Sequence, residues 1–126
     1  YTISDGNGGT DTATIAVTVT PVNDGPVAND DTAITTDEDT AVSNINVLNN
    51  DTDVDGDTLT VTGATADDGT VTINDDGTLN YTPNGDYNGS DTITYTISDG
   101  NGGTDTATIA VTVTPVNDGP VANDDT

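Results

Sequence analysis

The sequence contains no lysine, arginine or histidine, and it also lacks cysteine, methionine, tryptophan and phenylalanine. Without a cationic side chain no salt bridge between side chains can form. The formal charge of −23 is therefore relieved only by distance, by screening or by a bound cation. Without cysteine, disulfides and thiolate metal sites are excluded. A chain this acidic repels nucleic acids and anionic membranes, so we expect neither as a partner.

Large apolar residues are also scarce, because Leu, Ile and Val together make up only 24 of the 126 residues. A share below about 20%, combined with high net charge, is typical of disordered chains. The alternation of apolar residues with threonine indicates a folded chain instead, as in the segments 92–97 and 107–113. No stretch resembles a signal peptide or a transmembrane helix, so we expect no membrane insertion in this segment.

Short β-branched runs separated by Gly, Asp and Asn predict strands throughout and no helix. Turn signals include DDG at 67–69, DDG at 75–77 and DGNGG at 99–103. Seven short strands of this kind predict an all-β fold, an immunoglobulin-like or cadherin-like antiparallel β-sandwich. The predicted strands are 33–36, 41–48, 58–66, 69–74, 77–82, 91–98 and 104–116.

Residues 1–32 are identical to residues 95–126, an offset of 94 residues. A period of this length indicates a tandem array of whole domains rather than a solenoid of small units. A hairpin cannot bury a core by itself, so we expect the first residues to be frayed or held by a neighbouring chain. The predicted organisation is the C-terminal hairpin of a preceding repeat at 1–22, a calcium-binding linker at 23–31, a complete repeat at 32–116 and a linker into the next repeat at 117–126.

Nearly all carboxylates lie in the predicted loops and linkers, and in a seven-strand sandwich the loops gather at two ends. The first linker should therefore lie against the loop 51–57 and Asp99, and the second linker near 37–39, Asp86 and Asp91. Such all-oxygen surroundings suit Ca²⁺, which takes six to eight oxygen ligands, better than Mg²⁺; Zn²⁺ prefers His or Cys. The predicted metal ligands are Asn23, Asp24, Asp30, Asp31, Glu38, Asp51, Asp53, Asp55, Asp57, Asp86, Asp91, Asp99, Asn117, Asp118 and Asp124.

The run DTDVDGD at 51–57 matches the opening of an EF-hand calcium loop, with aspartates at alternate positions followed by glycine. We reject an EF-hand because the twelfth position is Thr62 instead of glutamate, and because no helix is predicted beside the loop. Asp and Asn are also ordinary turn formers, and we favour that interpretation for 67–69 and 75–77. Ligand use is favoured instead for Asp24, Asp30, Asp53 and Asp55.

The sequence resembles the tandem cadherin-like repeats of about 95 residues found in RTX-type and biofilm-associated giant adhesins of bacteria. The motifs that carry this resemblance are EDT, NDTDVDGD, YTP, NGSDTITYTISDG and PVND, and the match extends over essentially the whole chain. The resemblance implies a repeat in a long secreted stalk, exported by type I secretion and stiffened by Ca²⁺ between repeats. By analogy with cadherins, the ligands would be Asn23-Asp24 and Asn117-Asp118 in the linkers, Glu38, and an Asp-x-Asp pair at Asp53/Asp55 or Asp51/Asp53.

One departure from classical cadherins leaves the number of ions at each junction open. Pro21 and Pro115 stand where a cadherin linker has an additional aspartate. The glycine-rich nonapeptide of RTX calcium rolls is also absent from the sequence.

We therefore expect a structural extender repeat of an extracellular adhesin or surface filament, whose partners are the adjacent identical repeats and whose adhesion target is unknown. Millimolar extracellular Ca²⁺ suits weak sites of several carboxylates, which supports a location at the cell surface. The alternative is a glycan-binding or ice-binding module, suggested by regular threonine rows and by Tyr87. We expect no enzymatic activity. Catalysis without His, Cys, Lys or Arg would need a pair of carboxylates in a cleft, and the sequence indicates no such cleft. Acidity as halophilic solvation is disfavoured, because the acids are almost all Asp and lie in loops.

Overall fold

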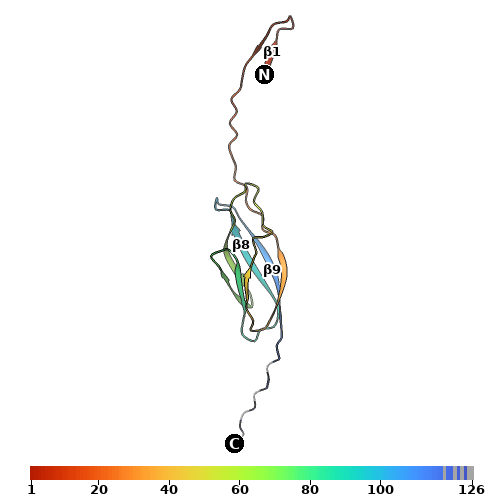
Figure 1. Cartoon of the computed structure of the whole chain (residues 1–126), viewed down its shortest axis with the longest axis vertical. Helices are drawn as coiled ribbons and strands as arrows, with labels where there is room; N and C mark the ends of the chain where they lie inside the picture. The colour runs from red at the N-terminus through yellow and green to blue at the C-terminus, as the bar shows by residue number, and fades with distance from the viewer. Residues whose placement is uncertain (118, 121, 123, 125–126) are drawn as a thin grey trace.

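The computed structural model describes residues 1–117, 119–120, 122 and 124. A β-sandwich forms its main body (Figure 1). The buried side chains come from both of its sheets. The prediction of a seven-strand immunoglobulin-like sandwich is confirmed. In spatial order the first sheet contains β3 (Asp31–Asp37), β9 (Thr104–Thr114), β8 (Gly89–Ser98) and β5 (Thr60–Ala66), and the second contains β4 (Val42–Ile45), β7 (Leu79–Pro83) and β6 (Gly69–Ile73).

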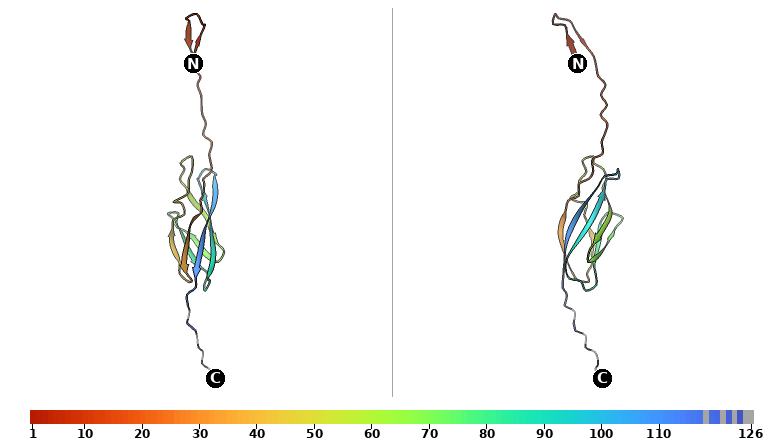
Figure 2. Two further views of the ribbon diagram at one scale, coloured as in Figure 1. Left: turned by 90° about the vertical axis from the view of Figure 1, so that its right-hand side faces the viewer. Right: turned by 180° about the vertical axis from the view of Figure 1, so that it is seen from behind.

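One strand pairing differs from the predicted antiparallel arrangement, because β3 and β9 are parallel. Both strands run from the end at which the linker 21–30 joins the sandwich to the opposite end, so the first and last strands of the repeat lie side by side (Figure 2). The chain therefore leaves the body at the end opposite to the one where it arrives.

The core is built from alternate residues of the long strands β8 and β9. Ile93, Tyr95 and Ile97 of β8 are fully buried, while the threonines between them face outward. Ile109 and the valines that follow it in β9 are buried in the same way. The second sheet contributes Leu79 and Tyr81 of β7, and Val47 closes the core beside them; all three are fully buried. Period-two alternation thus produces one compact core despite the small number of apolar residues.

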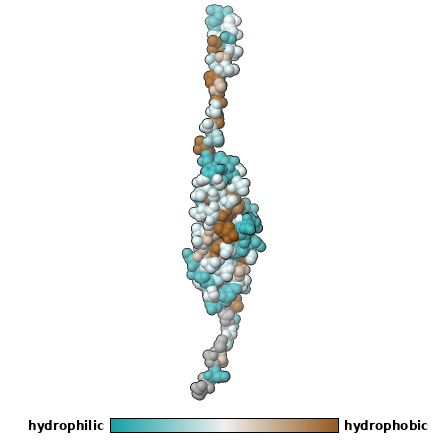
Figure 3. All heavy atoms as spheres, turned by 90° about the vertical axis from the view of Figure 1, so that its left-hand side faces the viewer, coloured by the Kyte–Doolittle hydropathy of each residue, from teal (hydrophilic) through white to brown (hydrophobic). Residues whose placement is uncertain are grey.

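The N-terminal hairpin lies apart from the sandwich (Figure 1). It consists of β1 (Thr2–Ser4) and β2 (Thr10–Thr12), and no strand is formed by residues 13–20. Ile15, Val17 and Val19 are 74%, 76% and 86% exposed, whereas the same residues in the second copy of this sequence belong to β9 and are buried. Figure 3 shows apolar patches spaced along the extended segment between the hairpin and the sandwich. The hairpin is thus frayed where it has no opposing sheet, as expected.

Candidate metal sites

Three aspartates of the β4–β5 loop gather at the end of the sandwich where the linker arrives. One carboxylate oxygen from each of Asp53, Asp55 and Asp57 lies within 4.8 Å of the others. The loop turns sharply here, because Asp53 Oδ1 accepts hydrogen bonds from the backbone N–H groups of Asp55 (2.8 Å) and Asp57 (3.3 Å), and Gly56 adopts a positive φ of 74°. This turn leaves Asp53 Oδ2 buried, with no donor among the described residues. A buried carboxylate oxygen without a partner is costly, and a cation would pair with it.

The linker is attached to these loops by hydrogen bonds. Asn23 Nδ2 donates to Asp99 Oδ2 at 2.9 Å, and the backbone N–H of Asp24 donates to Asp55 Oδ2 at 2.7 Å. Val27 forms a two-way backbone bridge with Thr52 of the β4–β5 loop, with N···O distances of 2.8 and 3.0 Å. A groove of about 450 Å³ remains between linker and loops. Its lining residues are Pro21, Val22, Asn23, Asp55, Asp57 and Asn101.

The Asp99 carboxylate holds the β8–β9 loop and the linker together. The Asn23 amide, followed by the backbone N–H groups of Asn101 and Gly103, lowers the pKa of Asp99. Asp99 is therefore ionised near neutral pH, and it is a buried residue at 3% exposure. The sequence placed Asp99 beside the first linker, and the structure brings it into direct contact with Asn23.

Asp105 was not among the predicted site residues, yet it also attaches the linker. Its Oδ2 accepts the backbone N–H of Ala28 at 2.9 Å, and this bond is the largest cause of its lowered pKa. Asp30 makes the reciprocal contact, because its Oδ1 accepts the backbone N–H of Thr108 at 3.0 Å. Asp30 thus attaches the end of the linker to β9. The alternation of β9 could have identified Asp105 from the sequence. Asp105 lies on the inward face of the strand, where the other residues are apolar.

Gly103 is required for the close approach of the linker to the β8–β9 loop. A Cβ at this position would lie 2.9 Å from Gly25 Cα and would collide with the Asp99 carboxylate. We expect Gly103→Ala to lower the free energy of unfolding by about 1–3 kcal/mol, because the Asn23–Asp99 contact must open. The control is Gly63→Ala, whose Cβ would meet no atom within 4 Å. Urea denaturation of both variants checks this, and equal stabilities would contradict it.

At the opposite end of the sandwich, Glu38 receives the departing chain. It is only 6% exposed, and its Oε1 accepts the backbone N–H of Val116 at 2.9 Å. Beside it, Asp39 Oδ1 accepts the backbone N–H of Asp86 at 3.0 Å. The sequence predicted that these three acids lie near the second linker, and the structure places them together at this end. Among the linker residues, Asn117 and Asp124 are exposed, and Asp118 lies outside the described residues.

Asp91 has a different role from the predicted one. Its carboxylate is 5% exposed and accepts hydrogen bonds from the Tyr81 hydroxyl at 2.6 Å and from the backbone N–H groups of Asp67, Asp68 and Thr92 at 2.7–3.2 Å. Burial, together with this bond to Asp91, raises the pKa of Tyr81 above its ordinary value. Both oxygens of Asp91 are occupied by protein donors, so it connects the β5–β6 turn to β8.

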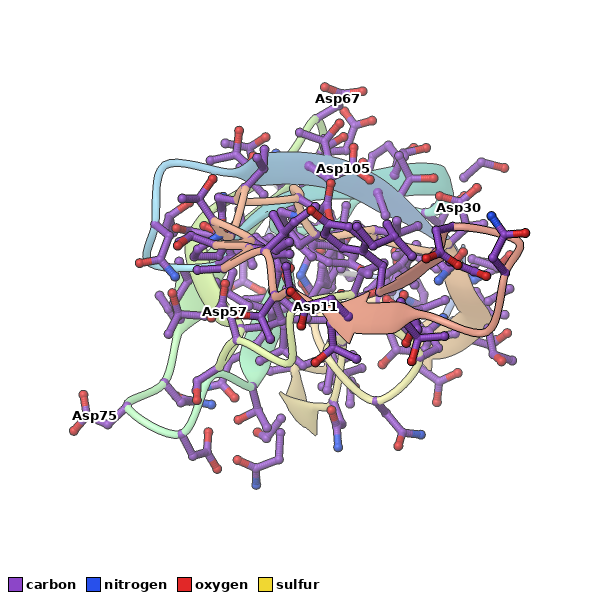
Figure 4. All side chains as sticks on the ribbon, turned by 90° about the horizontal axis from the view of Figure 1, so that it is seen from above. Asp11, Asp30, Asp57, Asp67, Asp75 and Asp105 are labelled. Carbon is purple, nitrogen blue, oxygen red and sulfur yellow. The ribbon has the colours of Figure 1, made fainter. Side chains whose placement is uncertain are left out.

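The aspartates of the two DDG segments, at 67–69 and 75–77, lie in turns, as their sequences indicate. Seen along the long axis, Asp67 and Asp75 point outward on separate sides of the body (Figure 4). Asp76 caps its own turn by accepting the backbone N–H of Thr78 at 3.0 Å. The 51–57 run lies between the strands β4 and β5, which agrees with the rejection of an EF-hand.

Two packed sheets, the β3-β9-β8-β5 and β4-β7-β6 strand orders and loop clusters at both ends define the class of immunoglobulin-like β-sandwich domains. The family model described as bacterial Ig domain matches residues 23–112. The chain therefore belongs to the family of bacterial Ig domains.

Solved structures with a similar fold include a domain of the endo-fucoidan hydrolase MfFcnA4 from glycoside hydrolase family 107. It is 24% identical to this chain with a TM-score of 0.51, and a variant of the same enzyme gives 24% and 0.52. Each comparison covers 83% of this chain but 16% of the enzyme, so it concerns the fold alone. No curated protein sequence gives a match. No helix long and apolar enough to cross a membrane occurs in the described part of the chain.

Proposed function

We propose that the chain is an extender repeat of a long bacterial surface protein, and that Ca²⁺ bound at the junctions between repeats makes the array rigid. The observation that carries this proposal is the cluster of Asp53, Asp55 and Asp57, with its buried and unpartnered oxygen, in contact with the linker. The chain has no cationic side chain to neutralise this cluster. All available ligands are oxygens, which suits Ca²⁺.

The repeat identity allows a complete junction to be assembled from contacts at the two ends of one repeat. Val22 is equivalent to Val116, whose backbone N–H binds Glu38. In an array, the glutamate of the preceding repeat that is equivalent to Glu38 would accept a hydrogen bond from the backbone N–H of Val22. It would thus lie next to Asn23 and Asp24, which contact the β4–β5 and β8–β9 loops of the following repeat. Carboxylates from two repeats would then share one short stretch of linker, and an ion between them would fix their relative orientation.

The positions of the chain ends support an extender role. The linkers join the sandwich at opposite ends, so consecutive repeats would follow one another along a single axis (Figure 1).

The cadherin-like resemblance supports an RTX-type, biofilm-associated adhesin outside the cell as the parent protein. Immunoglobulin-like domains of this kind typically have no catalytic activity, which agrees with the absence of a predicted active site.

The glycan-binding alternative receives less support. Tyr87, the one aromatic ring that the sequence offered as an exposed platform, packs against the core and donates its hydroxyl hydrogen bond to the Ser90 carbonyl. The ring is therefore partly buried, which leaves less of it available for the stacking contacts that sugars make. The similarity to fucoidan hydrolases concerns fold and carries no argument about sugar binding.

The junction proposal is tested with a chain extended by one period, so that it contains two complete repeats. Small-angle X-ray scattering should give a longer and narrower distribution of interatomic distances with Ca²⁺ than with EDTA. Asp55→Asn combined with Asp57→Asn in the second repeat should abolish this difference, whereas the exposed-turn variant Asp75→Asn should retain it. If the two-repeat chain has the same dimensions with and without Ca²⁺, the proposal is wrong.

A further inference from the structure

The segment SDGNGGTDT occurs at 4–12 and again at 98–106, so the chain holds the same Asn-Gly pair in two tertiary surroundings. The backbone of the two copies is alike. Gly8 and Gly102 adopt φ angles of 94° and 95°, and in each copy the aspartate two residues earlier accepts the backbone N–H of the asparagine at 2.8 Å. Asn7 and Asn101 are both exposed. The two pairs therefore share their sequence, their backbone conformation and their exposure to water.

The side chains of the two asparagines differ in what they contact. Asn101 Nδ2 donates to Asp57 Oδ2 at 2.9 Å and so joins the β8–β9 loop to the β4–β5 loop. Asn7 lies in the hairpin apart from the sandwich (Figure 1), and its side chain makes no hydrogen bond with any described residue. The tertiary structure thus restrains one copy of the pair and leaves the other unrestrained.

An Asn-Gly pair is prone to deamidation, because glycine has no Cβ that would shield its backbone nitrogen. This nitrogen attacks the asparagine Cγ. The N–Cγ bond forms, the Cγ–Nδ2 bond breaks, and ammonia leaves with the proton of the glycine N–H. Water then opens the resulting cyclic imide at either carbonyl, which gives aspartate or isoaspartate. The backbone N–H of Gly102 makes no hydrogen bond with a described residue, so its nitrogen is available for this reaction.

We propose that Asn101 is a deamidation site that the folded repeat protects through the hydrogen bond to Asp57. For the attack, the Asn101 side chain must rotate until its Cγ meets the Gly102 nitrogen, and the bond to Asp57 must break first. Hydrogen bonds to an ionised carboxylate are stronger than those between neutral groups. Conversion of Asn101 therefore follows the separation of the two loops, whereas Asn7 reports the rate of the same sequence without this restraint.

Deamidation would convert an attractive contact between the two loops into a repulsive one. Asp57 would face a second carboxylate in place of an amide donor, and the sequence has no cationic side chain to offset it. The β8–β9 loop also carries Asp99, which accepts the Asn23 amide of the linker. A modified repeat would therefore hold its linker less firmly. The site needs neither a bound ion nor a second repeat, so it is independent of the junction proposal.

Peptide mapping by mass spectrometry tests the protection on the full chain. The chain is incubated at mildly alkaline pH in EDTA, so that no bound divalent ion contributes, and is then digested with chymotrypsin, which cleaves after tyrosine. The four Asn-Gly pairs fall into four different peptides, 2–81, 82–87, 88–95 and 96–126, and fragment spectra locate the added mass within each. Asn101 should deamidate about tenfold more slowly than Asn7, because breaking a hydrogen bond to a charged group adds to the barrier. In urea that unfolds the sandwich, the two rates should be equal.

Two variants assign the protection to Asp57. Asp57→Ala should raise the rate at Asn101 to that at Asn7, whereas Asp75→Ala, which removes the same charge from an exposed turn, should leave the ratio unchanged. Equal rates in the folded wild type, or an unchanged ratio in Asp57→Ala, would overturn the proposal. Circular dichroism verifies folding, and Asp57→Asn replaces Asp57→Ala if the latter fails to fold. If neither folds, the ratio in the folded and the urea-unfolded wild type decides.

The effect of the modification is measured with substitutions that reproduce its aspartate product. Asn101→Asp should lower the urea midpoint of unfolding, and the shift should shrink at high salt, because screening weakens repulsion between exposed carboxylates. Asn7→Asp is the matched control and should unfold at the wild-type midpoint. If both variants unfold at the same midpoint, the loop contact does not depend on the Asn101 amide. A two-repeat chain that fails to respond to Ca²⁺ in scattering would leave all of these results unchanged.

Discussion

Replacing Asp91 by asparagine should lower the free energy of unfolding by about 3 kcal/mol or more, since each buried polar group left without a partner costs about 1–3 kcal/mol. The carboxylate accepts the Tyr81 hydroxyl and three backbone N–H groups, and only 5% of the residue is exposed. An amide retains one acceptor oxygen and directs an NH₂ group toward these donors. Because small domains are stable by only about 5–15 kcal/mol, such a loss is a large part of the total.

Urea denaturation followed by circular dichroism measures this effect. Asp75→Asn is the matched control, because Asp75 is exposed and points away from the body, so we expect a change within about 0.5 kcal/mol. Tyr81→Phe should have a smaller effect than Asp91→Asn, since it removes one of the four donors and leaves the others paired. An Asp91→Asn variant as stable as the wild type would show that the carboxylate is dispensable, and that the β5–β6 turn is held in another way.

Saturation with Ca²⁺ should raise the melting temperature of the full chain by about 10–20 °C. An ion that binds only the folded state stabilises it by about 2.7 kcal/mol at a concentration of one hundred times Kd. In a domain of this size, each kcal/mol shifts the melting temperature by about 4–8 °C. The physical reason is the excess of oxygens, because neither the Asp53–Asp55–Asp57 cluster nor the buried Asp31 oxygen has a cationic partner.

Differential scanning calorimetry in Ca²⁺ and in EDTA checks this shift. NaCl at matched ionic strength separates ion binding from general screening of the −23 charge. Mg²⁺ at the same concentration should have a smaller effect, because it retains its waters and demands near-octahedral geometry. Equal melting temperatures in Ca²⁺ and EDTA would count against the proposed ion site at the junction.

The sequence predicted the strands and the grouping of the loops well, because both depend on local patterns. Alternating apolar residues identified β8 and β9, and the even spacing of the strands placed Asp99 beside the linker. Individual carboxylates were less predictable. Asp91 was expected to bind metal but is saturated by hydrogen bonds, and Asp105 was overlooked although it holds Ala28. The distinction depends on which donors the fold brings near each oxygen, and these donors come from distant parts of the chain.

The two copies of one sequence show what the sequence by itself determined. Alternation of apolar and polar residues, the DGNGG turn and the linker motif are the same at 1–26 and at 95–120, and in both copies the turn joins a hairpin. Only the tertiary structure decided how far the second strand of each hairpin continues after the turn. Residues 107–114 continue β9 and bury Ile109, Val111 and Val113, whereas residues 13–20 remain extended and exposed. The reason is that a strand gains stability from the sheet and the core that cover it, and in this chain only the second copy has both.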